Sequence, residues 1–159
     1  MLRRAGFNVT TCGLNGLQVT GAHNVSVSAD IILDEALNRS WDMVVMPGGM
    51  PGAANLRDDV RVGNLLEQTS NNGGYVGAIC AAPIVLARFG FLKGTKATSY
   101  PGFGEQMPGA DYCEDRVVCD GQVLTSRGPG TAMEFALAIT EMLAGSAKAD
   151  ELKKQMLVK

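Results

Sequence analysis

Two short apolar runs, each closed by small residues, constrain the fold of this chain more than any other feature. The segment at residues 42–46 is apolar after Asp42 and stops at Pro47-Gly48-Gly49, and the run at residues 75–80 leads into a helical pattern over residues 81–89. Runs of this kind are typical of strands buried on both faces, as in a parallel sheet. The pattern therefore predicts buried parallel strands that are connected through helices.

The rest of the chain continues the alternation of strand and helix. The further predicted elements are strands at 7–14 and 96–99, hairpins at 17–28 and 116–126, and helices at 31–38, 60–69 and 130–143. Asp30 is the predicted N-cap of the first helix, Thr131 and Glu134 have the spacing of a capping box, and Gly145 follows the last helix. This order predicts an α/β fold with a doubly wound, mostly parallel sheet and helices on both faces. We expect a single domain over residues 1–159.

Composition and charge exclude several classes of protein. The net charge is −2 without a basic stretch, which argues against nucleic acid and anionic membranes as partners. No apolar run approaches the roughly 18 residues that span a bilayer, and the first residues do not resemble a signal peptide. Four cysteines without a CxxC pair, and a single histidine, argue against a disulfide framework and a zinc site. We expect a cytoplasmic protein without a metal or other cofactor.

Cys80 is the strongest candidate for a catalytic residue. It lies in Ala78-Ile79-Cys80-Ala81-Ala82, which has the pattern of a nucleophile elbow between a strand and a helix. Small neighbours suit such a turn because the backbone at the nucleophile is strained and crowded. A helix N-terminus favours the thiolate, which is the nucleophilic form of cysteine. The alternative is a buried, inert structural cysteine.

The turn at Gly48 and Gly49 also follows a buried strand. Ligands of doubly wound sheets bind beyond the carboxyl ends of the strands, so this turn and Cys80 are expected at the same sheet edge. The backbone N–H of Gly49 and that of Ala81 are therefore candidates for an oxyanion hole. An ordinary turn is the alternative interpretation.

Three further features are candidates for the same site. Tyr100 follows the strand predicted at 96–99 and offers a phenol that donates a hydrogen bond but is a poor base at neutral pH. His23 is the only histidine and lies in the early hairpin, where a lone exposed histidine is usually incidental. The loop at residues 127–131, which contains Pro129, either lines the pocket or simply leads into the following helix.

Five segments together resemble the ThiJ/PfpI superfamily, and within it the branch of the parkinsonism-associated deglycase. They are residues 2–6, 44–49, 78–83, 124–131 and 134–139. The resemblance implies a flavodoxin-like fold, usually a homodimer, in which Cys80 is the reactive cysteine and Gly49 and Ala81 are backbone donors. It also places Arg4 and His23 where the family has polar groups near an oxidised cysteine. The resemblance also implies a location in the nucleus or in mitochondria, in addition to the cytoplasm.

The resemblance implies a function as well. It indicates a cofactor-free glyoxalase or protein deglycase that acts on methylglyoxal, glyoxal and early glycation adducts of proteins. The alternative is a redox sensor or redox-activated chaperone that works through oxidation of Cys80. A class I amidotransferase also uses a cysteine elbow, but its His-x-Glu pair is absent after Arg116.

The sequence departs from the family pattern in two ways. The family's first strand, and the glutamate that follows it and serves as acid/base, precede Met1, so we expect an N-terminally shortened form. Losing an interior strand would expose two strand edges and an apolar strip, which favours aggregation. Tyr100 stands where the family often has a histidine.

Overall fold

A four-stranded sheet organises the computed structural model, which describes residues 1–158. Its strands are β5 (Met43–Met46), β6 (Tyr75–Ile79), β10 (Val123–Ser126) and β9 (Val117–Asp120), in that spatial order. The first three run parallel and β9 is antiparallel to β10. The hairpin predicted at 116–126 is therefore confirmed, and the sheet is mostly parallel as expected.

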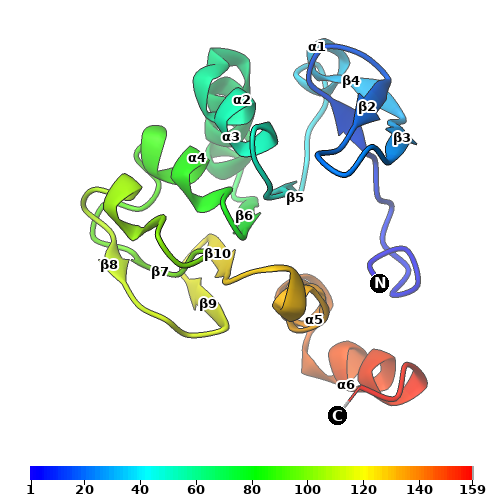
Figure 1. The fold of residues 1–159 in the computed structure, drawn as a ribbon. Helices are drawn as coiled ribbons and strands as arrows, with labels where there is room; N and C mark the ends of the chain where they lie inside the picture. Colours follow the sequence, from blue (N-terminus) through cyan, green and yellow to red (C-terminus); the bar gives the residue numbers. More distant parts are fainter. Residues whose placement is uncertain (159) are drawn as a thin grey trace.

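Helices lie on both faces of this sheet (Figure 1). One face carries α2 (Gly52–Asp58), α3 (Val60–Asn71) and α4 (Pro83–Arg88), whereas α5 (Ala132–Ala144) covers the other face and packs against α6 (Ser146–Gln155). The predicted α/β architecture is confirmed, although α2 and α6 were not predicted from the sequence. No helix among residues 1–158 is long and apolar enough to cross a membrane.

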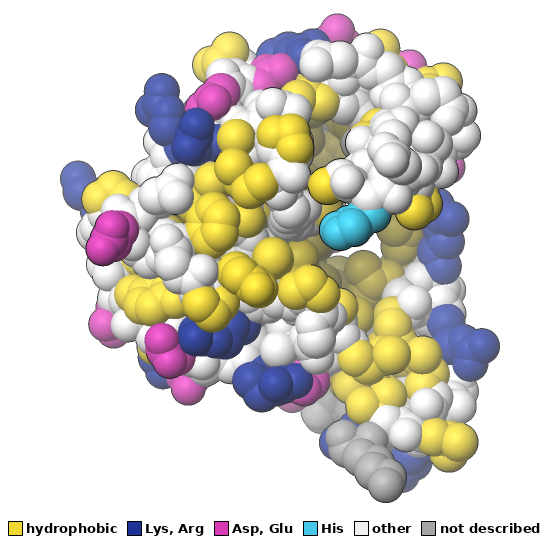
Figure 2. Space-filling model, viewed as in Figure 1, with side chains coloured by type: hydrophobic (Ala, Val, Ile, Leu, Met, Phe, Trp, Pro, Cys, Tyr) yellow, Lys and Arg dark blue, Asp and Glu magenta, His cyan; other side chains and the backbone are white. Residues whose placement is uncertain are grey.

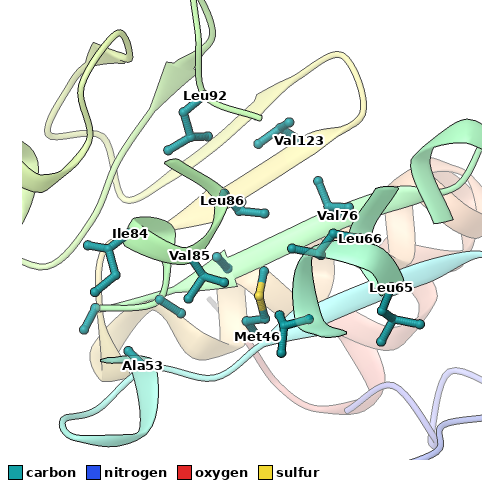
Figure 3. Close-up of a cluster of buried hydrophobic side chains, with 14 of the residues drawn as sticks. Met46, Ala53, Leu65, Leu66, Val76, Ile84, Val85, Leu86, Leu92 and Val123 are labelled. Atoms are coloured by element: carbon teal, nitrogen blue, oxygen red, sulfur yellow. The ribbon is translucent and has the colours of Figure 1, made fainter. Parts of the chain in front are cut away.

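The main core lies between the sheet and the face covered by α3 and α4 (Figure 3). Val76 of β6 is fully buried there together with Leu66 of α3 and Leu86 of α4. A smaller cluster on the opposite face joins Leu124 of β10 to two side chains of α5. β6 and β10 are thus covered on both faces, which explains the apolar sequence of β6 and the complete burial of Thr125 and Ser126 in β10.

The first forty residues form a small lobe, hereafter the N-terminal lobe, which packs against α3 through α1 and contributes Ile31, Leu33 and Ala36 to the main core. It contains β1 (Cys12–Gly13), β2 (Gln18–Thr20), β3 (Ser26–Ser28), β4 (Ile31–Ile32) and α1 (Leu33–Ala36). β1 pairs with β4 in parallel and β2 pairs with β3 as the predicted hairpin. Neither pair is hydrogen-bonded to the four-stranded sheet.

Another two-stranded pair lies beside the sheet. β7 (Lys96–Ala97) runs parallel to β8 (Asp111–Tyr112), and the short helices η1 (Gly104–Gln106) and η2 (Pro129–Thr131) complete the elements. The strands predicted at 7–14 and 96–99 are therefore shorter than expected, with two residues in each.

Two predicted helix caps are wrong because long-range partners take the capping side chains. The Asp30 carboxylate accepts from the Thr11 N–H at 2.7 Å and from Arg3 at 3.0 Å, and α1 begins after Ile32 instead. Glu134 forms an ion pair with Arg116 at 2.7 Å.

The other member of that predicted capping box, Thr131, also has a different partner. Its side chain caps no backbone N–H of α5 and instead bonds to Gly128, accepting from the N–H at 3.1 Å and donating to the carbonyl at 2.8 Å. Gly145 does end α5, with a φ of +82°.

β5 differs from the buried strand that its sequence predicts. It is an edge strand of the four-stranded sheet, and Val45 remains 37% exposed although Met46 is buried. Among residues 1–158, no strand is hydrogen-bonded to β5 on the side that faces the N-terminal lobe.

Truncating Leu66 tests the position of the core. This side chain is fully buried, so Leu66→Ala is expected to lower the free energy of unfolding by about 2–5 kcal/mol. Val60→Ala in the same helix removes a side chain that is 67% exposed, and its effect is expected within about 0.5 kcal/mol. Chemical denaturation of both variants measures the difference, and equal effects would contradict the assignment of this face to the core.

Candidate active site

Cys80 occupies the turn between β6 and α4. Its φ is +65°, in the left-handed region that costs a non-glycine residue about 1–2 kcal/mol. Two backbone hydrogen bonds hold it there: its N–H donates to the Ser126 carbonyl at 2.9 Å, and its own carbonyl accepts from the Tyr100 N–H at 2.8 Å. The side chain is partly exposed. The turn thus has the geometry of a nucleophile elbow.

Gly48 packs directly against this turn. A Cβ at position 48 would lie 2.5 Å from Cys80 Cβ, 2.6 Å from the Ile79 carbonyl oxygen and 3.0 Å from the Ala81 nitrogen. Only a residue without a side chain allows this approach. The structure therefore brings the turn after β5 and the turn after β6 together, as the sequence predicts.

Gly49 and Ala81 carry the candidate oxyanion donors. Gly49 has a φ of +88°, and its carbonyl accepts from the Ala53 N–H at 2.8 Å. Within residues 1–158, neither the Gly49 N–H nor the Ala81 N–H donates to another protein group. Both remain free to bind an oxygen atom of a substrate.

A buried network of hydroxyl groups supports the loop that follows β10. The Ser126 hydroxyl lies 2.6 Å from the Thr131 hydroxyl and 3.1 Å from the Arg116 carbonyl oxygen. Because the Ser126 carbonyl holds the Cys80 N–H, this network helps to fix the position of Cys80. Ser126 was not singled out from the sequence, and Thr131 was predicted only as a helix cap.

Tyr100 and the loop at 127–131 lie side by side. The Tyr100 ring packs against Gly128, where a Cβ would lie 3.3 Å from Cδ2 of the ring, and the side chain remains 45% exposed. Pro129 begins η2 in the same loop. Tyr100 therefore lies beside the Cys80 turn, through its backbone hydrogen bond to the Cys80 carbonyl, whereas the place of Pro129 in the site remains a prediction.

Arg127 is a further candidate that the sequence indicated only as part of its loop. Its Nη2 forms an ion pair with Glu114 at 3.3 Å, whereas its buried Nη1 has no hydrogen-bond partner among residues 1–158. The position of Arg127 directly after the strand predicted to end at residue 126 was the signal available in the sequence.

Arg4 and His23 are not joined to this site. Arg4 lies in the exposed N-terminal turn and His23 in the exposed turn between β2 and β3. Within residues 1–158, no hydrogen bond or ion pair connects either side chain to the Cys80 turn. Their proximity to the cysteine remains a prediction.

Cys12 and Cys119 are surface residues whose thiols are partly buried, whereas Cys113 is half-buried like Cys80. Burial raises the pKa of Cys12 and that of Cys119, and nearby Glu35 adds to the effect at Cys12. All four cysteines are free thiols. In the described part of the chain, no cluster of three His, Cys, Asp or Glu side chains could hold a metal ion.

The sequence of the whole site region matches one family. The model of the DJ-1/PfpI family matches residues 1–142. The chain belongs to the DJ-1/PfpI family. It is 45% identical over 161 residues to Protein dj-1beta of Drosophila melanogaster, covering 99% of this chain and 86% of the relative. The crystal structure of Drosophila DJ-1beta superimposes with a TM-score of 0.95 and covers 99% of this chain and 87% of that one. The resemblance stated from the sequence is thereby confirmed.

One relative of the DJ-1/PfpI family carries an enzymatic name. The glutathione-independent glyoxalase DJR-1.2 of Caenorhabditis elegans is 36% identical over 158 residues, with 98% of this chain and 84% of the relative covered. The length of relatives varies, since this chain covers 36% of Protein DJ-1 homolog B of Arabidopsis thaliana, which is 41% identical.

Gly48→Ala tests the contact between the two turns. The added Cβ would lie 2.5 Å from Cys80 Cβ, so the turn must move, and we expect the alkylation rate of Cys80 with iodoacetamide to fall by about tenfold or more. Gly52→Ala is the matched control because its Cβ meets no atom within 4 Å. Peptide mass spectrometry measures each thiol, and the half-buried Cys113 reports general unfolding. An unchanged Cys80 rate would contradict the close packing.

Glu35→Gln tests the cause of the raised pKa at Cys12. Removing the carboxylate should lower that pKa and increase alkylation of Cys12 near neutral pH by at most about threefold, since burial is the larger cause. Glu67→Gln removes the same charge from the exposed face of α3 and should leave the rate unchanged. Equal rates in all three proteins would show that Glu35 has no part in the shift.

Proposed function

We propose that this protein is a cysteine-dependent, cofactor-free glyoxalase and protein deglycase. The substrates would be methylglyoxal, glyoxal and early glycation adducts of proteins. The observation that carries the proposal is the elbow geometry of Cys80, with two free backbone N–H groups beside it. The named glyoxalase among the relatives supports the same reaction class.

The first chemical step would be addition of the Cys80 thiolate to the aldehyde carbon of the dicarbonyl. The new carbon–sulfur bond converts the aldehyde oxygen into an oxyanion, which takes a proton to give a hemithioacetal. The N–H groups of Gly49 and Ala81 are the candidate donors to this oxygen. Fixed donors aimed at a developing negative charge lower the barrier without reorganisation during the reaction.

The remaining steps would be a proton shift and a hydrolysis. A proton leaves the former aldehyde carbon and another is added at the neighbouring carbonyl carbon, which produces a thioester of the 2-hydroxy acid. Water then cleaves the thioester and returns the thiol. Methylglyoxal plus water thus becomes lactate, and glyoxal becomes glycolate, with no net oxidation and no cofactor.

A redox sensor or redox-activated chaperone is the second candidate. Partial exposure of the Cys80 side chain supports it, because oxidation to the sulfinate needs an accessible cysteine that reacts as the thiolate. The enzyme also needs an acid/base for the proton shift, and the sensor does not. Product formation therefore separates the two functions.

The proposal also covers the cellular compartment, the assembly and the partners of the protein. Four free thiols suit a reducing compartment such as the cytoplasm. A homodimer is proposed as the assembly, with small dicarbonyls or glycated proteins as partners and without nucleic acid or membranes.

Replacing Cys80 tests the function. Cys80→Ser is expected to reduce lactate formation from methylglyoxal by at least about a hundredfold, since it removes the covalent nucleophile. Cys113→Ser removes another half-buried thiol and should retain the activity. Lactate is measured by an enzyme-coupled assay with protein that is free of glutathione.

Two outcomes would contradict the enzymatic proposal. Equal activity of both variants would show that Cys80 is not the nucleophile. No lactate from the wild-type chain, together with ready conversion of Cys80 to the sulfinate by hydrogen peroxide, would favour the sensor.

A further inference from the structure

A thiol and a thioether meet on the face of the sheet that α5 covers. Cys119 Sγ lies 3.9 Å from Met142 Sδ, with Cys119 on β9 and Met142 in the last turn of α5. Cys119 is exposed and Met142 is half-buried, so ions in solution reach the pair. Neither residue belongs to the candidate active site around Cys80.

Strand pairing and the period of the helix explain this contact. Cys119 lies directly opposite Leu124 of β10, so both side chains point to the same face of the sheet. Leu124 packs there with Phe135 and Ile139 of α5, and Met142 follows Ile139 by three residues on the same side of the helix. β9 is an edge strand of the four-stranded sheet, which leaves Cys119 exposed. Two separate elements thus hold the two sulfur atoms together.

The separation of the sulfur atoms suits one shared metal ion. With metal–sulfur bonds of about 2.3 Å, two sulfur atoms 3.9 Å apart subtend an angle of about 115° at the ion. This angle is close to that between the ligands of a trigonal ion, so neither side chain has to move. The exposure of Cys119 leaves the third position open to water or to a small ligand.

Negative charge surrounds the thiol. Burial raises the pKa of Cys119, and the charges of Asp120 and Glu141 add to this effect. The same two charges favour a cation at the sulfur atom, where it takes the place of the thiol proton. The Asp120 carboxylate accepts from the uncharged backbone N–H of Lys96 at 2.8 Å, whereas the Lys96 ammonium pairs with Asp115. The charge of Asp120 is therefore not neutralised by that lysine.

The types of ligand decide the class of ion. Thiolate and thioether sulfur are soft ligands that select Cu(I), whereas Mg²⁺ and Ca²⁺ prefer clustered carboxylate and carbonyl oxygen atoms. On the face that Figure 2 shows, the acidic side chains are dispersed around the edge of the molecule. Across residues 1–158, no three His, Cys, Asp or Glu side chains are grouped to hold a metal ion, as a zinc site would require. The sulfur pair fits a soft monovalent ion best.

We propose that Cys119 and Met142 form a surface site for a soft monovalent metal ion of the Cu(I) type. Cys119 releases its proton to solvent and binds the ion as the thiolate, and Met142 adds a bond from a lone pair of its sulfur. The ion keeps its oxidation state. The carboxylates of Asp120 and Glu141 supply negative charge but no ligand atom. The site is independent of the proposed enzymatic function, because Cys80 has no part in it.

The methyl group of Met142 reports the site directly. The whole chain is labelled with carbon-13 at the methyl groups of its eight methionines and titrated with Cu(I) in the absence of oxygen and added thiols. We expect a saturable shift of the Met142 resonance, which Met142→Leu assigns because this resonance is then missing. Cys119→Ser should abolish the shift. Cys113→Ser removes a thiol outside the pair and should retain it.

A pair of methionine variants tests the thioether ligand. Met142→Leu keeps an apolar side chain of similar volume but removes the sulfur, so about tenfold or more Cu(I) should be needed to protect Cys119 from alkylation. Met133→Leu is the matched control, because it removes a 41% exposed methionine from the first turn of the same helix. Peptide mass spectrometry measures the alkylation, and Cys12 serves as a second exposed thiol for comparison.

Three results would overturn the proposal. The first is a Met142 resonance that does not move with Cu(I) in wild-type protein whose circular dichroism shows it to be folded. The second is a shift that persists in Cys119→Ser. The third is equal protection of Cys119 in Met142→Leu and in the wild type, which would show that the thiol binds the ion without the thioether.

Discussion

The left-handed backbone of Cys80 is the constraint on which the arrangement of the site depends. A cysteine with a φ of +65° is maintained only because neighbouring segments hold it from several directions. The Ser126 carbonyl and the Tyr100 N–H bind its two backbone groups, and Gly48 approaches its Cβ where any side chain would collide. The ends of β5, β6 and β10 must therefore meet at one edge of the sheet. This edge is where the thiol and its candidate backbone donors lie together.

Local chemistry was sufficient to predict much of this arrangement. Short apolar runs indicated β5, which Pro47-Gly48-Gly49 closes, and β6, and the small residues around Cys80 indicated the elbow. The hairpin of β9 and β10 was equally visible, since two apolar strands flank Asp120-Gly121. The approach of Gly48 to Cys80 followed from the rule that parallel strands end at the same edge.

What the sequence could not reveal depends on contacts between distant residues. Asp30 has the composition of a helix cap, but Thr11 and Arg3 compete for its carboxylate. Glu134 likewise has the spacing of a capping-box residue, but its carboxylate forms an ion pair with Arg116. The exposure of Val45 could not be predicted from its own segment either, because an apolar strand sequence does not show whether the strand is hydrogen-bonded on both edges.

The most direct test of the central claim is to map where methylglyoxal first bonds to the protein. The whole chain is mixed with carbon-13-labelled methylglyoxal, quenched in acid within one turnover, and digested for mass spectrometry of the four cysteine peptides. The account predicts that the label is concentrated on Cys80, although Cys12 and Cys119 are the more exposed thiols. Label distributed according to exposure, with Cys12 and Cys119 ahead of Cys80, would contradict it.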